Sequence, residues 1–598
     1  MLFVARPRQE GFLMSFDRNS RVHDILRSPE GRRVVETAFP SLLGHPALEH
    51  LRTWPMWLLA EQFSTATAAT TDPALLWEAL AGLETPPIPV TSAVPSTAGR
   101  PDYEGPGVAE ASAKPEVPRG ATRWSPAEIV IAGPSHGNPF IDVELTARFS
   151  RDGTTVTVGG FYDGDGRWII RFLPESSGCW EFVTSSNARS LHGLTGRFDV
   201  AEAPLGEHGP VRVDGFHFAH ADGTRYSPWG TTAYAWIHQP EADREATLRT
   251  LESAPFNKLR MLVFPKAYDY NADEPELYPF PGDPEQGFDH SRFDPEFFRR
   301  LESAVVELGR RGIQADIILF HPYDRWGFAE LGQATDDSYT RYLVRRLWAY
   351  PNVWWSMANE YDFVLGKTES DWERLADIVV ANDPARHLLS IHNGLAFYDH
   401  SRPWITHASV QRIDQYRTAE EVDIWRRMWG KPVVVDECGY EGDLEHGWGN
   451  LTGEEMVRRC WEGAIRGGYV GHGETYYRSD EQLWWAKGGD LTGDSPDRIA
   501  FLGRIVAESP GGVLEPLSTY VGVPYGGIVG VHHLYYYGRQ QPAFASLRLP
   551  PDRDFHIDVI DTWEMTVTRL SGVYRGICRI SMPGKEFMAV RATAVDSR

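Results

Sequence analysis

The sequence has few cysteines for its length. Of its 598 residues only four are cysteines, and Cys179, Cys438, Cys460 and Cys578 form no CxxC pair. Scattered thiols of this kind are typical of a reducing compartment, so we expect four reduced, buried thiols and a cytoplasmic protein. The first residues, MLFVARPRQEGFLM, lack the pattern of a secretory signal, which agrees with that expectation.

Basic residues and long apolar runs are also scarce. Lys and Arg together number 59 against 82 for Asp and Glu, which gives a formal net charge of −23. Binding to nucleic-acid phosphates needs the opposite balance, so we expect no nucleic-acid partner. No run approaches the roughly 18 apolar residues of a membrane helix, so we expect no membrane partner. Aromatic residues are abundant instead, with 21 Trp, and such rings fill cores or stack on sugars.

The length corresponds to about three to four typical domains. Helical spacing predicts a small helical module over residues 15–85, and a Pro/Ala-rich linker follows over 86–119. Short alternating runs predict an Ig-like β-sandwich over 120–205, and similar runs predict a second β-sandwich over 513–598. We therefore expect a multidomain protein of the α/β plus β class.

Between the sandwiches, residues 206–512 alternate strand-like and helix-like segments. Eight apolar runs are predicted as strands: 226–234, 257–265, 313–320, 352–360, 387–393, 404–411, 431–440 and 467–476. Eight strands that alternate with helices over this length predict a (β/α)8 TIM barrel. The alternative is a doubly wound parallel sheet, but no glycine-rich phosphate turn follows the first strand.

Two glutamates occupy the positions where barrel enzymes place their chemistry, at the carboxyl ends of strands. NVWWSMANEYD sets Asn359 and Glu360 directly after an apolar strand, and KPVVVDECGYEG sets Glu437 at the same level three strands later. Retaining glycoside hydrolysis needs such a pair about 5–5.5 Å apart. We predict that one of the two glutamates protonates the leaving oxygen and the other attacks the anomeric carbon, and that Asn359 donates to the sugar 2-hydroxyl.

Two neighbouring carboxylates are alternatives to Glu437. Asp436 and Glu441 flank Glu437 in the sequence. Because side chains alternate along a strand, we expect Asp436 to face the outer side of the barrel, which favours Glu437.

Other polar and aromatic residues near the predicted strand ends are candidates for substrate binding. They are Lys266, His321, Asp324, His392, Gln411, His472, Glu474, Trp229, Trp326 and Trp485. Lys266 and Asp324 could instead form simple loop salt bridges. The histidines also fit a metal-dependent barrel hydrolase, but the first strand has no His-x-His pair and no compact ligand set occurs. We therefore expect no metal and no cofactor.

Longer stretches resemble known families. GPSHGNPFIDVELTARF (133–149) is similar to DUF5060 sandwiches, ADIILFHPYDRWGF (315–328) and LWWAKGGDLTGDSPDRIAFL (483–502) resemble DUF4038-like glycosidase barrels, and IDVIDTWEMTVTRL (557–570) resembles DUF5605 sandwiches. The resemblance covers about residues 120–598. It implies a retaining glycosidase of glycoside hydrolase clan A with Glu360 as acid/base and Glu437 as nucleophile.

The resemblance has one departure. Many clan A enzymes carry a Tyr or His on strand six that orients the nucleophile, whereas here that strand ends in Ala408-Ser409-Val410-Gln411. Gln411 and Tyr416 are the candidates for this orienting role.

The leading hypothesis is a retaining glycoside hydrolase that cleaves small oligosaccharides or glycosides by double displacement. We expect exo action, because residues 266–292, rich in Tyr, Pro and acidic residues, would close one side of the barrel mouth. A non-catalytic carbohydrate-binding or assembly protein on a barrel scaffold is the alternative. The flanking domains could also support a homo-oligomer.

Overall fold

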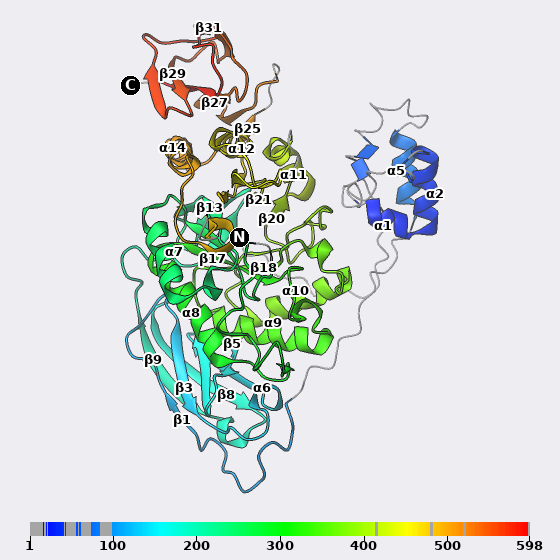
Figure 1. Ribbon diagram of the computed structural model, residues 1–598, viewed down its shortest axis with the longest axis vertical. Coiled ribbons are helices and arrows are strands. Elements are labelled where there is room, and N and C mark those ends of the chain that lie inside the picture. The colour runs from blue at the N-terminus through cyan, green and yellow to red at the C-terminus, as the bar shows by residue number, and fades with distance from the viewer. Residues whose placement is uncertain are drawn as a thin grey trace. The chain divides into compact units, whose positions relative to one another are not determined.

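The computed structural model describes most of the chain after residue 98. The described residues are 16, 20, 22–40, 42–43, 56–57, 59–60, 73–83, 99–268, 270–412, 417–478, 482–517 and 522–595. They divide into two units, one of residues 1–94 with 395–400 and one of the remainder. Figure 1 colours the chain from blue at the N-terminus to red at the C-terminus. Within the described residues, no helix has both the length and the apolar character that crossing a membrane requires.

Among the described residues, the first unit includes the helices α1 (Val22–Arg27), α2 (Pro29–Ala38) and α5 (Pro73–Ala81). Helix α2 begins after Ser28, whose hydroxyl accepts the Gly31 N–H at 3.2 Å, a common N-cap contact. Apolar residues of all three helices share one buried core. These helices lie in the range 15–85, where helical spacing predicted them. Within that range, residues 15, 17–19, 21, 41, 44–55, 58, 61–72 and 84–85 lie outside the described part of the chain.

The N-terminal sandwich consists of two β-sheets. One sheet has the order β1 (Lys114–Glu116), β3 (Ala127–Ala132), β7 (Arg167–Phe172), β6 (Phe161–Tyr162), and the other has the order β2 (Ala121–Thr122), β9 (Thr195–Ala201), β8 (Gly178–Ser186), β4 (Leu145–Arg151), β5 (Thr154–Gly159). Alternate residues of β3 and β4 are buried, as the alternating sequence requires. A short helix, α6 (Pro139–Asp142), precedes β4.

The second half of the predicted linker belongs to this sandwich. Strand β1 pairs with β3, Tyr103 is buried, and the Glu104 carboxylate accepts the Ser190 N–H at 2.7 Å. The prediction of a free linker is therefore wrong for residues 99–119. The prediction rested on composition, which is rich in Pro and Gly here. These residues are held mainly by backbone and side-chain hydrogen bonds, which composition does not reveal.

The eight predicted strands form a closed parallel barrel, which confirms the predicted fold class. In order they are β13 (Gly230–Thr232), β14 (Lys258–Leu262), β17 (Gln314–Phe320), β18 (Val353–Ala358), β19 (Leu389–Ser390), β20 (Ala408–Gln411), β21 (Val433–Glu437) and β23 (Tyr469–Val470). Parallel bridges between Thr231 and His472 and between His392 and Ser409 join the two sheet segments into one ring. A small sheet of β10 (Val211–Asp214), β11 (His217–His220) and β12 (Arg225–Tyr226) precedes the barrel.

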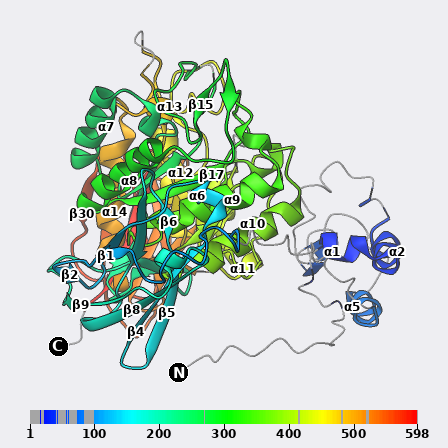
Figure 2. The same cartoon turned by 90° about the horizontal axis from the view of Figure 1, so that it is seen from below.

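Helices surround the barrel strands. They are α7 (Glu241–Ser253), α8 (Pro295–Arg310), α9 (Gln333–Leu347), α10 (Glu369–Asn382), α11 (Val422–Trp429), α12 (Gly453–Ile465), α13 (Trp484–Lys487) and α14 (Ser495–Ala507). Helix α8 begins after Asp294, which accepts the Glu296 N–H at 2.8 Å, and Pro295 lies in the first turn. Figure 2 shows α8 and α9 beside strand β6 of the sandwich.

The C-terminal sandwich has a six-stranded and a two-stranded sheet. The first has the order β25 (Pro516–Leu517), β26 (Tyr525–Ile528), β27 (His532–Tyr536), β32 (Met588–Ala594), β29 (Phe555–Asp561), β30 (Thr566–Arg569), and the second pairs β28 (Phe544–Arg548) with β31 (Ile577–Ser581). Both sheets contribute to one apolar core. Ion pairs from Arg539 to Glu455 and from Arg591 to Glu508 connect this sandwich to the barrel helices.

All four cysteines are free thiols. Cys438 and Cys460 are buried, as predicted, but Cys179 is exposed and Cys578 is half-buried. The expectation of buried thiols is wrong at these two positions. Cys179 lies on β8 between inward-facing residues, so strand alternation turns its side chain outward.

A buried ion network joins the N-terminal sandwich to the barrel. Arg171 of β7 donates two hydrogen bonds to Glu302 of α8, at 2.6 and 3.0 Å. Arg346 of α9 donates to the same carboxylate at 2.6 Å and to Asp163 at 2.8 Å. Both guanidinium groups are buried, so each needs these carboxylates as partners.

Glu302→Ala removes the shared carboxylate and leaves two buried cations without their main partner. We expect the free energy of unfolding to fall by about 3–5 kcal/mol, measured by urea denaturation of the full chain. The matched control is Glu307→Ala on the same helix, where the partly exposed pairs with Arg310 and Arg311 should contribute about 1 kcal/mol or less. Equal effects of the two substitutions would contradict the role of the network.

Candidate active site

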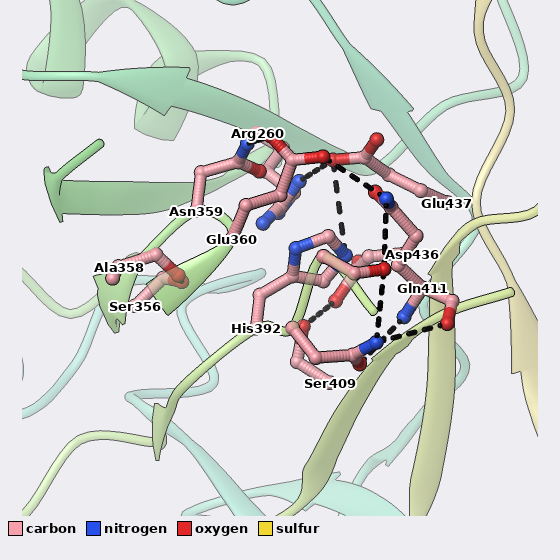
Figure 3. Close-up of polar contacts among 12 residues, drawn as sticks. Arg260, Ser356, Ala358, Asn359, Glu360, His392, Ser409, Gln411, Asp436 and Glu437 are labelled. Carbon is pink, nitrogen blue, oxygen red and sulfur yellow. Dashed lines mark hydrogen bonds and ion pairs between the residues drawn. The ribbon is translucent and has the colours of Figure 1, made fainter. Parts of the chain in front are cut away.

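The two predicted glutamates meet at the carboxyl ends of facing barrel strands. Glu360 follows β18 and Glu437 ends β21, and Figure 3 shows their carboxyl groups pointing toward one another. Both residues are buried. Glu360 has φ 51°, a left-handed conformation that is unfavourable for a residue with a side chain. Such local strain is typical of functional positions, and here it turns the chain sharply as the strand ends.

The Glu437 carboxylate is held by positive charge and hydroxyl groups. Arg260 of β14 donates to its Oε1 at 2.8 Å, the Tyr234 hydroxyl donates to the same oxygen, and His392 lies 3.7 Å away. Burial raises the pKa of Glu437, but His392, Arg260 and the Tyr234 hydroxyl together lower it. The charge of His392 contributes only in acid, because burial and Arg260 lower the pKa of His392 to about 3. Glu437 is therefore an anion at neutral pH.

Glu360 has neutral hydrogen-bond donors in place of a salt bridge. Asn359 Nδ2 donates to Oε2 at 3.1 Å, Gln411 Nε2 donates to Oε1 at 3.0 Å, and the Tyr323 hydroxyl donates to Oε2. Burial and the nearby charge of Glu437 raise the pKa of Glu360 to about 7, against these donors and Lys266. One carboxyl is thus poised to give up a proton while its neighbour stays ionised, the division of roles that acid/base and nucleophile require.

Lys266 and Trp485 form the next part of the site. The Lys266 ammonium lies 4.1 Å from the Trp485 ring centre and 4.2 Å from that of Tyr234. Trp485 also meets Tyr234 edge to face, at 5.7 Å between centroids. Apolar ring faces next to charged groups are the surfaces that bind sugars well, because a sugar has both apolar C–H faces and hydroxyl edges.

Comparison with known proteins agrees with this geometry. Residues 213–496 match the family model "Apiosidase-like, catalytic domain", and residues 120–187 and 522–593 match the domains of unknown function DUF5060 and DUF5605. A crystal structure of a candidate glycoside hydrolase from Bacteroides vulgatus ATCC 8482 is 39% identical, over 79% of this chain and 99% of that chain, with a TM-score of 0.76. The chain belongs to the glycoside hydrolases, and its barrel matches the apiosidase-like catalytic model.

More distant structures share the fold. A glycoside hydrolase family 5 protein from the same Bacteroides vulgatus strain is 14% identical, with a TM-score of 0.51, over 64% of this chain and 94% of that chain. Among curated proteins no significant match was found. These matches confirm the resemblance inferred from the sequence and the barrel fold, and they support a general glycosidase activity.

Five of the predicted binding residues surround the two carboxyls of this glycoside hydrolase. They are Asn359, Lys266, His392, Gln411 and Trp485. Within the described part of the chain, Trp485 Nε1 and Gln411 Oε1 are buried and have no hydrogen-bond partner. Buried polar atoms are normally paired, so these two atoms indicate where a ligand or water would bind.

Three other predicted binding residues, Trp229, Asp324 and Trp326, have their hydrogen bonds with other parts of the chain. Trp229 precedes β13 and its N–H binds Asn257, so it lies at the opposite end of the barrel from Asn359. Asp324 accepts the Trp326 N–H at 2.8 Å, and Trp326 Nε1 donates to Glu274 at 2.9 Å. These contacts hold the loop after β17 to the segment 266–292. The substrate-binding prediction is therefore wrong for Trp229, and for Asp324 and Trp326 it stays a prediction.

His321 contacts the backbone next to the site and neither of the two carboxyls. Its Nε2 lies 3.2 Å from the Phe264 carbonyl, and its Nδ1 accepts the Tyr323 N–H at 3.1 Å. Burial and the charge of Lys266 lower the pKa of His321 to about 3, so the ring is neutral. His321 therefore holds the backbone that carries Tyr323, and the prediction of direct substrate contact is wrong.

His472 and Glu474 belong to a group that could in principle hold a metal. Among the described residues, Glu441, His472 and Glu474 are the three whose ligand atoms lie within 4.8 Å of one another. The carboxylates are already engaged, with Glu474 accepting N–H groups of 492–493 and Glu441 accepting those of 494–495. These contacts anchor β22 (Glu441–Gly442) and β24 (Glu474–Thr475) to the start of α14. Neither His472 nor Glu474 is part of the site, contrary to prediction.

The prediction that Asp436 faces the outer helices is also wrong. Its carboxylate binds Lys258 at 2.7 Å and Ser409 at 2.6 Å, both on other strands across the barrel interior. The register between β20 and β21 shifts at this point, because Val410 lies opposite Val435 but Gln411 lies opposite Glu437. Asp436 is therefore the extra residue of a β-bulge, and both carboxylates can reach inward. Asp436 is bound by Lys258 and Ser409 inside the barrel, so Glu437 is the carboxylate that reaches the barrel mouth.

The residues that orient Glu437 do not come from strand six, where the resemblance led us to expect them. Gln411 contacts Glu360 rather than Glu437, and Tyr416 lies outside the described residues. Arg260 and Tyr234 hold Glu437 instead. The sequence reasoning missed Arg260, although a charged residue inside the apolar run LRMLVF was an available signal. It also missed Tyr323, which has no distinguishing local pattern.

Tyr323→Phe tests whether the Tyr323 hydroxyl lowers the pKa of Glu360. The hydroxyl stabilises the Glu360 carboxylate, so its loss should raise the pKa of Glu360 above about 7. The alkaline limb of the pH profile of kcat/KM for a glycoside should then move upward by roughly one unit. Tyr477→Phe, at an exposed tyrosine, is the control and should leave the limb in place. A downward shift in Tyr323→Phe would contradict the assignment.

Proposed function

We propose that the protein is a retaining glycosidase in which Glu437 is the nucleophile and Glu360 is the acid/base. One observation carries the proposal: two buried carboxyls point toward one another, and their environments move their pKa values in opposite directions. This is how a double displacement divides the work between two carboxyls.

In the first step, Glu437 attacks the anomeric carbon while Glu360 protonates the departing oxygen. The hydrogen bonds of Arg260 and Tyr234 converge on Glu437 Oε1, which leaves Oε2 as the attacking oxygen. The products are a covalent glycosyl ester and the free leaving group. In the second step, Glu360, now an anion, takes a proton from water as that water attacks the ester. Asn359 is proposed to donate to the sugar 2-hydroxyl, and Lys266, His392, Gln411 and Trp485 to line the sugar site.

We further propose that the substrates are small oligosaccharides or glycosides cleaved from one end. Support for exo action comes from the segment 266–292, whose Glu274 binds both Arg325 and Trp326 of the loop after β17. A terminal apiosyl residue is the first sugar to test, because the catalytic domain matches an apiosidase-like model. Release of single sugar units from an oligosaccharide, followed by mass spectrometry, would support exo action, and internal fragments would contradict it.

Variants of each carboxyl test the mechanism. Glu437→Ala should reduce kcat by about 10⁴-fold or more with every substrate, because the covalent bond cannot form. Glu360→Ala should lose activity mainly on glycosides with poor leaving groups, and added azide should restore turnover of nitrophenyl glycosides, because azide needs no general base. The azide product of Glu360→Ala should keep the anomeric configuration of the substrate, as observed by NMR.

Glu445→Ala is the matched control, since this carboxylate is exposed in the loop after β21. It should retain full activity. Undiminished cleavage by Glu437→Ala, or an inverted first product from the unmodified protein, would contradict the proposal. An inactive protein that still binds sugars would instead support the non-catalytic alternative.

We also propose a cytoplasmic location, supported by the four free cysteines. Fractionation of source cells would test it. A homo-oligomer stays a prediction that light scattering at two concentrations would decide.

A further inference from the structure

The Lys266 side chain has an unusual environment at the site. Its ammonium nitrogen lies within 4.1 to 5.2 Å of the ring centres of Tyr234, Tyr268, Tyr323 and Trp485, and the residue is 1% exposed. No described residue accepts a hydrogen bond from it or forms an ion pair with it. The aromatic faces attract the cation in place of water, but they carry no formal charge to balance it.

The balancing charge comes from the two carboxyls. Burial and the nearby Arg260 lower the pKa of Lys266 to about 8, while Glu360 and Glu437 act in the opposite direction. Lys266 is therefore still mostly a cation at neutral pH. A lysine this deeply buried stays charged only when anions stand close to it.

The proposed double displacement moves that negative charge. Before reaction Glu437 is the anion and Glu360 holds a proton. In the covalent intermediate Glu437 is a neutral ester and Glu360 is the anion, because its proton has left with the first product. The site thus carries one negative charge in both states, on different residues. The Lys266 ammonium lies between them, 4.4 Å from the ring centre of Tyr323, whose hydroxyl binds Glu360, and 4.2 Å from that of Tyr234, whose hydroxyl binds Glu437.

We propose that Lys266 is a positioning residue that supplies the fixed counter-charge for this transfer and keeps Glu360 ionised as the base of the second step. The inference rests on the proposed function. It goes beyond substrate binding, because Lys266 would act through Glu360 rather than on the sugar.

The other groups that face Glu360 cannot replace Lys266. Tyr323 and Gln411 donate hydrogen bonds but carry no charge, and His392 is neutral because burial and Arg260 lower its pKa to about 3. Arg260 is a cation but is bound to Glu437 Oε1 at 2.8 Å. Tyr234 is likewise directed to Glu437. Lys266 is the remaining cation of the described groups that act on Glu360.

Lys266→Met is the direct test, with a dinitrophenyl glycoside whose cleavage is accepted by the unmodified protein. The leaving group needs no acid, so the second step limits turnover. We expect kcat to fall by about 10²-fold, KM to fall with it as the intermediate accumulates, and azide to restore turnover. The pKa of Glu360 should rise, so the alkaline limb of kcat/KM for glycosides with poor leaving groups should move to higher pH. Lys266→Arg, which keeps the charge, should recover part of kcat, and Lys585→Met on the C-terminal sandwich should match the unmodified protein.

A second measurement needs no variant. Because Lys266 loses its proton above its lowered pKa, kcat of the unmodified protein on the dinitrophenyl glycoside should decline as the pH rises above about 8. A general base alone would give a level profile there, since high pH favours its active form. A level kcat up to pH 10 would overturn the proposal even if Lys266→Met failed to fold.

The two levels of inference fail differently. If Glu360→Ala is not restored by azide, the proposed function itself is wrong. Azide could instead restore turnover of Glu360→Ala but not of a folded Lys266→Met, and the alkaline limb of kcat/KM of Lys266→Met could stay in place. Lys266 would then only bind substrate, and this further inference would be overturned.

Discussion

The mutual repulsion of two buried carboxyls is the interaction on which the site depends. Glu360 and Glu437 point toward one another away from water, so both cannot ionise cheaply. Arg260 and Tyr234 bind Glu437 and fix the charge there. Glu360 receives only neutral hydrogen bonds and Lys266, so the proton stays on Glu360. The asymmetry of the surroundings, rather than of the carboxyls, assigns the two roles.

A second charged layer lies below the mouth. Lys258 bridges Asp316 and Asp436 at 2.6 and 2.7 Å, and all three are buried within the barrel. This layer holds Asp436 away from the mouth and fills the interior with paired charges where most barrels use apolar side chains. It also places fixed charges close beneath Arg260, whose pKa they raise.

The flanking domains stabilise the barrel from outside. The ion network of Arg171, Glu302 and Arg346 joins the N-terminal sandwich to helices α8 and α9. Helix α8 precedes β17, and the loop after β17 carries Tyr323. A rigid barrel wall therefore supports the donor that sets the titration of Glu360, although none of the network residues touches the site.

By itself, the sequence determined the order of the domains, the eight barrel strands and the pair Glu360 and Glu437, because hydrophobic periodicity and strand ends are local features. It placed Trp229 and His472 wrongly, and it missed Arg260. Tertiary structure alone decided these positions and the aromatic surroundings of Lys266. The reason is that strand tilt and closure of the ring determine which side chains from different strands share a layer, and no local pattern records that.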